Sequence, residues 1–210
     1  LTVENVSPQT TQCAPGGQFS VSYQVKNIGN GATGAGWTER IYLEGTKGTR
    51  TYIGSQQYVS TLAAGSSQNR TFSSVLPTLL HIDGEARVMV EIVPGANTGE
   101  LLADQGNNTR YSASYVMLSK CIYLSTDKNT VREGSSYATL TLSRSGDWST
   151  AETFTISCSV SNLFTCNGMT MPCTVTIPVR SSGTTLRIAA VDDNIVRARE
   201  TDITVSGANG

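Results

Sequence analysis

The sequence predicts an all-β protein that consists of two tandem immunoglobulin-like β-sandwich domains joined by a very short linker. Short runs in which apolar and polar residues alternate recur along the whole chain, and clusters of Gly, Pro and Asn separate them. Valine and tyrosine, which pack well on pleated strands, are frequent, and Gly and Ser supply turns. Helical periodicity is nearly absent, and only residues 77–82 could form a single helical turn.

The first predicted domain, residues 1–118, opens on a strand-like LTVENV and continues with six further strands. Around Val21, Tyr23 and Val25, apolar residues alternate with Ser and Gln, so we expect these three side chains to face the core. The six strands are expected at residues 19–26, 37–43, 52–59, 67–75, 85–93 and 108–118.

The second predicted domain, residues 119–210, repeats this pattern with different turns. Apolar residues alternate with polar ones in three runs, so we expect their side chains to point inward. These residues are Leu140 and Leu142, then Phe154, Ile156, Cys158 and Val160, and then Val175, Ile177 and Val179. The boundary has no Pro-rich or Ser-rich stretch, which predicts restricted motion between the domains. The strands are expected at residues 121–125, 136–143, 153–160, 173–179, 184–191 and 200–205.

Charge and hydropathy exclude several classes of function. Residues 1–119 carry seven Lys/Arg against eight Asp/Glu, and residues 120–210 carry eight against eight. Because no basic face is predicted, a nucleic-acid partner is not expected. No apolar run reaches the roughly 20 residues that span a bilayer, and no signal peptide precedes the first strand. We therefore expect a piece cut from a larger exported protein, with no membrane span in this part.

Residues 1–118 carry a series of short motifs in a characteristic order. They are APGGQFSVSYQVKNIGNGATG, WTERIYL, LAAGSS, LPT, IDGEARVMVEIVPGAN and the closing QGNNT. In these motifs the first half resembles CARDB, the cell-adhesion-related module of bacteria. The resemblance implies a seven-stranded immunoglobulin-like sandwich in a secreted or surface-anchored prokaryotic protein, and it leaves the ligand open.

A second set of motifs, VREG, LTLSRSG, TTLRIAAV, VDDN and ETDI, lies within residues 121–207. They are similar to the Calx-β module of sodium–calcium exchangers and bacterial surface proteins. That family binds Ca²⁺ at one pole where enough acidic residues converge. Carried over by position, the resemblance implies metal ligands at Glu133, Asp192, Asp193, Asn194 and Glu200.

The middle loop of the second domain departs from the calcium-binding members of that family. The segment NLFTCNGMTMPC contains no carboxylate, whereas those members carry acids there. Calcium takes six to eight oxygen ligands, several of them charged. Two interpretations stay open. One is a weak calcium site, with Ca²⁺ as the cofactor. The other is a turn in which Asp192 and Asp193 accept backbone N–H bonds, with no cofactor.

The five cysteines include no CxxC pair, which argues against structural zinc and for disulfides in an exported protein. In an immunoglobulin-type sandwich the first and last strands finish at the same pole. We therefore expect Cys13, at the first turn, to meet Cys121, just after the last strand. A bridge there would contribute about 4–5 kcal/mol and would fix the angle between the domains. The alternative is two buried thiols.

Cys158, Cys166 and Cys173 offer one more bridge and a spare thiol. Cys158 continues an inward alternation and can pack as a small core residue. We expect a Cys166–Cys173 bridge. This covalent bond would order the loop that bound calcium orders in the Calx-β family. Pairing of Cys158 with Cys166 or with Cys173 stays open.

The sequence contains no recognisable group of catalytic residues. His81 is the only histidine, and with Asp83 it is expected on a solvated turn rather than in a catalytic dyad. No GxSxG, HExxH or phosphate-binding glycine loop is present, so we expect no enzyme.

Aromatic residues are the sequence's candidates for ligand contact. Trp148 lies in a predicted hairpin loop, where an exposed ring would be a candidate for polysaccharide binding or for packing against a neighbouring domain. Trp37, Tyr42, Tyr52 and Tyr58 fall in neighbouring strands, and Trp37 is expected in the core.

Together these observations predict a non-catalytic fragment of a secreted or cell-surface prokaryotic multidomain protein that acts as a spacer and adhesion module. Two alternatives remain: an accessory carbohydrate-binding region of a polysaccharide-degrading enzyme, and a weakly calcium-binding adhesin segment. The expected partners are neighbouring domains of the larger protein, with a polysaccharide or another surface protein as a further candidate.

Overall fold

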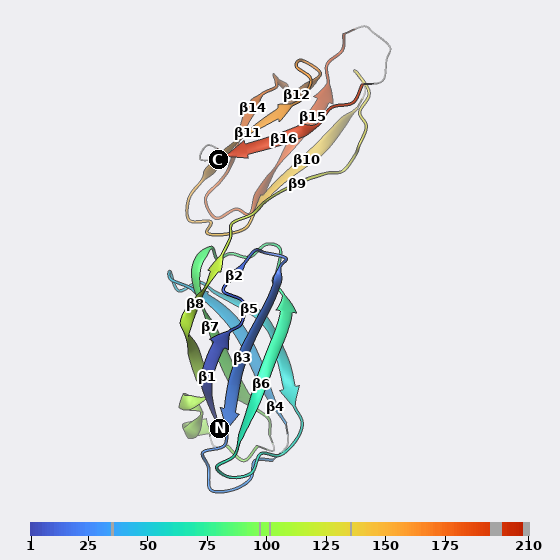
Figure 1. Cartoon of the computed structure of the whole chain (residues 1–210). Coiled ribbons are helices and arrows are strands. Elements are labelled where there is room, and N and C mark those ends of the chain that lie inside the picture. Colours follow the sequence, from blue (N-terminus) through green and yellow to red (C-terminus); the bar gives the residue numbers. More distant parts are fainter. Residues whose placement is uncertain (35, 97, 101, 135, 194–198, 208–210) are drawn as a thin grey trace. The chain divides into compact units, whose positions relative to one another are not determined.

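The computed structural model describes residues 1–34, 36–96, 98–100, 102–134, 136–193 and 199–207. The chain divides into two compact units, Leu1–Cys121 and Ile122–Gly210. Each unit contains two β-sheets that face one another, as Figure 1 shows. The predicted fold class, two tandem immunoglobulin-like β-sandwiches, is confirmed.

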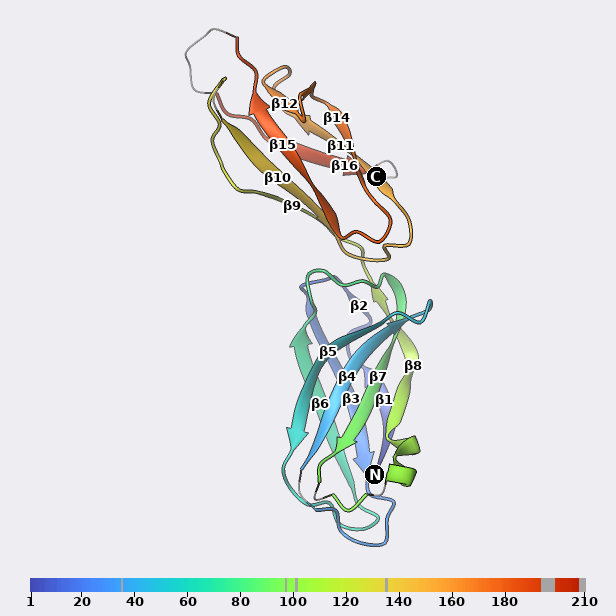
Figure 2. The ribbon, with the colours of Figure 1, turned by 180° about the vertical axis from the view of Figure 1, so that it is seen from behind.

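The first unit packs a three-stranded sheet against a five-stranded one. The three-stranded sheet has the order β1 (Thr2–Pro8), β3 (Gln18–Lys26), β6 (Ser67–Val75). The five-stranded sheet has the order β2 (Gln12–Cys13), β8 (Thr109–Leu118), β7 (Gly84–Pro94), β4 (Trp37–Gly45), β5 (Arg50–Tyr58). Within this unit, Figure 1 is seen from the side of the smaller sheet and Figure 2 from the side of the larger one.

Inward-pointing residues of both sheets fill the first sandwich. Val21, Tyr23 and Val25 of β3 are each at most 3% exposed, so their predicted direction is confirmed. Gly54 of β5 has a packing role, because a Cβ atom there would lie 2.7 Å from the ring of Phe72 in β6. The missing side chain therefore lets the Phe72 ring approach the backbone of the opposite sheet.

Two short elements of the first unit differ from the sequence prediction. The single helical turn expected at residues 77–82 is a non-helical turn. A 3-10 helix, η1 (Leu102–Asn107), was not predicted. Such a helix is too short to show a periodic pattern of apolar residues.

The second unit pairs a five-stranded with a three-stranded sheet. The larger sheet has the order β13 (Met169–Thr170), β12 (Phe164–Cys166), β15 (Gly183–Ala190), β10 (Tyr137–Arg144), β9 (Ile122–Thr126). The smaller sheet has the order β14 (Cys173–Ile177), β11 (Glu152–Cys158), β16 (Ile203–Gly207). Leu140, Leu142, Phe154 and Ile156 are buried as predicted. Val160 and Val179 are exposed instead, because β11 and β14 end two residues before them.

Strands β12 and β13 form a tight hairpin that the sequence prediction missed. Asn167 and Gly168 connect them, with φ of 51° and 82° respectively. Two consecutive residues with positive φ are typical of a type I′ turn, for which Asn-Gly is the preferred sequence. This hairpin places Cys166 at the inner surface of the second unit.

Candidate functional site

A carboxylate, Glu39, lies fully buried between the two sheets of the first unit. Its oxygens accept hydrogen bonds from the Tyr23 hydroxyl (2.5 Å), Trp37 Nε1 (3.1 Å), Gln56 Nε2 (2.9 Å) and Arg70 Nε (2.9 and 3.0 Å). Burial and the Glu39 carboxylate raise the pKa of Tyr23 well above its usual value, so the phenol stays a donor. These bonds fasten β3, β4, β5 and β6 together, and they occupy the carboxylate.

The outer face of the five-stranded sheet carries the tyrosine row: Tyr111 of β8, Tyr42 of β4 and Tyr52 of β5. Met89 of β7 lies between Tyr111 and Tyr42 in the strand register. The rings of Tyr42 and Tyr52 meet edge to face with centroids 5.5 Å apart. Met89 is only 2% exposed, which indicates that its neighbours cover it, whereas Tyr52 is 51% exposed.

A second cross-strand row runs beside the tyrosines and pairs Arg50, Glu44, Arg87 and Tyr115 in register. Arg50 donates to Glu44 (2.7 Å) and to the Tyr111 hydroxyl (2.8 Å), and thus connects the two rows. Arg87 donates to the Tyr115 hydroxyl at 3.1 Å, and its guanidinium carbon lies 5.0 Å from the centroid of that ring.

A hollow of about 410 Å³ opens at the end of this second row. It is lined by Glu44, Gly45, Thr46, Gly48, Arg87 and Tyr115. We call it the Arg87–Tyr115 hollow. Tyr115 is 40% exposed, so an aromatic side chain and charged hydrogen-bonding groups lie together in one place.

The charges of this outer face balance. Its strands point three arginines and three glutamates outward, namely Arg40, Arg50, Arg87, Glu44, Glu85 and Glu91. Arg50 lies 2.7 Å from Glu44, and Arg40 lies 3.8 Å from Glu91. The Tyr42 hydroxyl also donates to Glu91, at 3.2 Å. The strands of this face are therefore polar and aromatic without a net charge, and Lys47 lies in the β4–β5 turn beside them.

Three of the five calcium candidates line one cavity of about 1400 Å³ in the second unit, namely Glu133, Asp192 and Glu200. A fourth, Asp193, forms an ion pair with Arg199. The fifth, Asn194, lies outside the described residues. Among the residues that the structure describes, no three Asp, Glu, His or Cys side chains come close enough to hold a metal ion.

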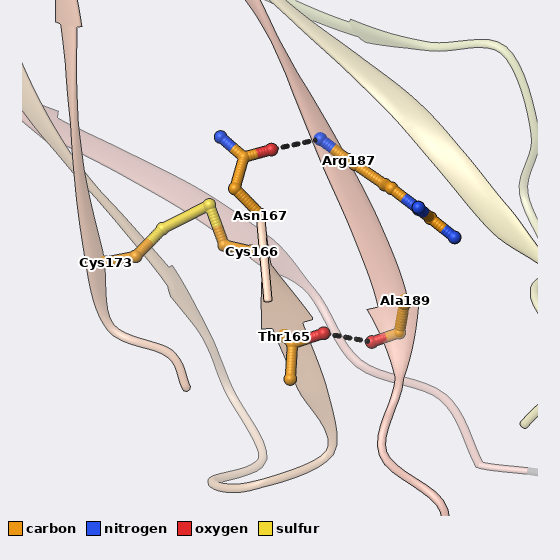
Figure 3. Close-up of a disulfide and its surroundings, with 6 residues drawn as sticks. All are labelled: Thr165, Cys166, Asn167, Cys173, Arg187 and Ala189. Carbon is orange, nitrogen blue, oxygen red and sulfur yellow. Dashed lines mark hydrogen bonds between the residues drawn. A yellow bond between two sulfur atoms is a disulfide. The ribbon is translucent and has the colours of Figure 1, made fainter. Parts of the chain in front are cut away.

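A disulfide joins Cys166 of β12 to Cys173 of β14 and so connects the two sheets of the second unit (Figure 3). Beside it, Asn167 accepts a hydrogen bond from the backbone of Arg187 at 2.8 Å. Cys158 keeps its thiol, which donates to the carbonyl of Val160 at 2.8 Å.

The expected Cys13–Cys121 bridge is not formed, and this prediction is corrected. Both residues keep their thiols. The parallel register of β2 and β8 places Cys13 opposite Leu118, three residues before Cys121. Extended chain covers up to about 10 Å in three residues, whereas a disulfide needs Cα atoms within about 7 Å. Instead, the Cys13 thiol donates to the Gln18 carbonyl at 3.2 Å.

Trp148 is also placed differently from the expectation. It is half-buried, and its indole nitrogen is shielded from solvent, so the exposed loop-tip ring is not found. Its carbonyl accepts a hydrogen bond from the Arg180 backbone at 2.7 Å. The exposed aromatic surface lies on the tyrosine row instead. Of its members the sequence reasoning had noted Tyr42 and Tyr52 but missed Tyr111, as it missed Tyr115 in the neighbouring row.

A guanidinium, that of Arg144, is fully buried in the second unit. It donates to the carbonyls of Ser181 (3.1 Å) and Pro178 (3.0 Å) and lies 3.3 Å from Glu152. Like Glu39, Arg144 therefore has structural partners within its own unit.

His81, the only histidine, is exposed. No helix among the described residues has the length and apolar character needed to cross a membrane.

The first unit matches a known protein family. The CARDB family profile matches residues 1–112, and the search of curated protein sequences finds no match. Among solved structures, the CARDB domain of the PF1109 protein from Pyrococcus furiosus, crystallised with di-metal ions, is 18% identical; the match covers 56% of this chain and 86% of that one, with a TM-score of 0.38.

Two further similar structures are a beta-glucosidase from Listeria innocua in complex with glucose and CBD12 from CALX1.2. The first is 16% identical over 55% of this chain and 16% of the enzyme, with a TM-score of 0.36. The second is 6% identical over 98% of this chain and 80% of that chain, also with a TM-score of 0.36. Since the CARDB profile matches 112 of the 210 residues, the chain belongs to the CARDB family.

Proposed function

We propose that this chain is a non-catalytic part of a secreted or cell-surface prokaryotic multidomain protein, in which it acts as a spacer and adhesion segment. The CARDB membership supports a modular role, and the Cys166–Cys173 disulfide fits an oxidising compartment. The second unit is proposed to be of Calx-β type. The buried ionisable groups Glu39 and Arg144 support a non-catalytic role, because both are occupied by structural partners.

The observation that carries the spacer role is the parallel pairing of β2 with β8. Met117 N donates to the Thr11 carbonyl at 2.8 Å, and Ser119 N donates to the Cys13 carbonyl at 3.0 Å. Pulling the first unit by its two ends draws parallel strands past one another along their axes. Both hydrogen bonds are then loaded together rather than opened one after the other, which suits a module that transmits tension between neighbouring domains.

Single-molecule stretching of the 210-residue chain tests this role. We expect the first unit to unfold in one abrupt event that releases about 400 Å of chain. Met117→Pro removes one of the two loaded N–H groups and should lower the unfolding force, whereas Val59→Pro, at an exposed position after β5, should leave it unchanged. Gradual extension without a force peak, or equal forces in wild type and Met117→Pro, would contradict the spacer proposal.

A second candidate function, glycan binding as an accessory region of a larger protein, is favoured by the tyrosine row. In this row the ring of Tyr52 is exposed, Tyr42 and Tyr111 are half-buried, and polar groups surround them. The ligand class follows from its charge and geometry and is developed below.

A further inference from the structure

We propose that the outer face of the first unit, formed by the tyrosine row and the Arg87–Tyr115 hollow, binds a neutral polysaccharide. This inference rests on the proposed adhesion role and names the ligand of that role. The stretching experiment above does not depend on the ligand, so the two proposals can fail separately.

The arrangement of the rings fits an extended chain of sugars. The tyrosine row crosses from β8 to β5, which is three strand spacings or about 14 Å. Such a span can contact more than one pyranose ring. The C–H faces of pyranoses are apolar, while their edges carry hydroxyl groups. An exposed aromatic ring surrounded by hydrogen-bonding side chains complements both features.

Hydrogen bonds hold two of the three rings of the tyrosine row in place before any ligand arrives. The Tyr42 hydroxyl is bonded to Glu91, and the Tyr111 hydroxyl to Glu44 and Arg50. Fixed side chains lose little conformational entropy when a ligand binds, and tyrosine has few rotatable bonds to begin with. The face is therefore organised for contact, in contrast to a surface of long flexible side chains.

The charge balance decides between a neutral and an acidic glycan. Three arginines face three glutamates, and Arg50 and Arg40 already have carboxylate partners at 2.7 and 3.8 Å. A polyanion would have to compete with these carboxylates and would meet their repulsion. Hydroxyl groups, in contrast, can both donate to Glu44 and accept from Arg87 without disturbing the balance.

The Arg87–Tyr115 hollow provides a place for one sugar beside the tyrosine row. Its lining combines the exposed Tyr115 ring with the Arg87 guanidinium and the Glu44 carboxylate. Gly45, Thr46 and Gly48, at the β4–β5 turn, also line the hollow. A hexopyranose stacked on Tyr115 would thus have charged hydrogen-bond partners at its edge.

Affinity electrophoresis of the 210-residue chain tests the proposal. Native gels would contain arabinoxylan, glucomannan or mixed-linkage β-glucan, and polygalacturonate would serve as the acidic probe. We expect retardation by at least one neutral polysaccharide, with little change between low salt and 0.5 M NaCl. Tyr52→Ala and Tyr115→Ala should each weaken binding about tenfold, equivalent to about 1.4 kcal/mol. Tyr52→Phe, which keeps the ring, should retain binding.

Tyr137→Ala is the matched control, because Tyr137 is 43% exposed and belongs to the second unit, so it is not part of the proposed site. It should bind as wild type does, and all variants should melt within a few degrees of wild type. The proposal is overturned by free migration in every neutral gel. Retardation in polygalacturonate alone, or undiminished binding by Tyr52→Ala and Tyr115→Ala, would overturn it as well.

Discussion

The two units have the same sandwich architecture but differ in what holds their sheets together. In the first unit, 23 of the described residues form a buried apolar cluster, and the Glu39 network lies within it. In the second unit the corresponding cluster has 10 residues, and two of these are the disulfide partners Cys166 and Cys173. A smaller core supplies less hydrophobic free energy, so a covalent connection contributes a larger share of the stability.

The polar connections differ in the same way. Glu39 gathers donors from four strands at the middle of the first sandwich. Arg144, at the end of β10, reaches carbonyls of the loop around Pro178 and Ser181. One unit therefore depends on a side-chain network between its sheets, and the other on a disulfide and a strand-end contact. A substitution that removes one of these connections should therefore destabilise one unit and leave the stability of the other unchanged.

The largest expected effect comes from Glu39→Gln. An amide NH₂ would then face the donors that now bond to the carboxylate, and the Arg70 guanidinium would lose its ion partner. We expect the free energy of unfolding of the first unit to fall by about 3 kcal/mol. Trp37 reports this unit by fluorescence once Trp148, the second of the two tryptophans, is replaced by Phe.

Glu91→Gln is the matched control on the outer face. Glu91 is half-exposed and lies 3.8 Å from Arg40, so its loss should cost less than about 0.5 kcal/mol. Similar losses in the two variants would show that the buried network has no special role.

Removal of the disulfide should affect the second unit alone. Cys166 and Cys173 enclose a short loop, for which chain entropy gives about 2 kcal/mol. For a unit of this size, Cys166→Ala with Cys173→Ala should lower its melting temperature by about 10 °C. Calorimetry would record the transition of the first unit at its original temperature. Cys158→Ser serves as the control, and a shift of the first transition would contradict the separation of the units.

Alkaline pH should weaken the first unit through Tyr23. Burial and Glu39 raise the pKa of Tyr23, so above pH 10 the folded state keeps a proton that the unfolded state has lost. Stability from this group is complete below pH 10 and falls above it by up to about 1.4 kcal/mol per pH unit. Tyr23→Phe should remove this slope, whereas Tyr52→Phe, which deletes an exposed phenol, should not. Equal slopes in wild type and Tyr23→Phe would rule out this role.

Alternation along the strands was enough to predict the sandwich and much of its interior. Val21 and Leu142 are fully buried where the alternation placed them inward. The β12–β13 hairpin was missed, although Asn167-Gly168 is a strong local turn signal. Its strands of three and two residues are too short to show alternation.

The candidate site was less predictable, because it depends on strand register. Tyr111 and Tyr52 are far apart in sequence and lie on one face only because β8, β7, β4 and β5 are neighbours. The same register placed Cys13 opposite Leu118, which a topological argument about poles could not anticipate. Glu39 shows a further limit: an acidic residue at an inward position of a strand does not reveal its partners, which come from three other strands.

The smallest expected effect is that of calcium on the second unit. Asp193 is paired with Arg199, and among the described residues no three carboxylates converge on one point. At 2 mM calcium we therefore expect a stabilisation below about 0.2 kcal/mol, as for a dissociation constant of about 10 mM or weaker. The measurement is the melting temperature with calcium and with excess chelator. A rise of several degrees that the chelator reverses would contradict this prediction. It would also mean that the second unit, with the smaller core, is held by a metal ion in addition to its disulfide, and the contrast with the first unit would become sharper.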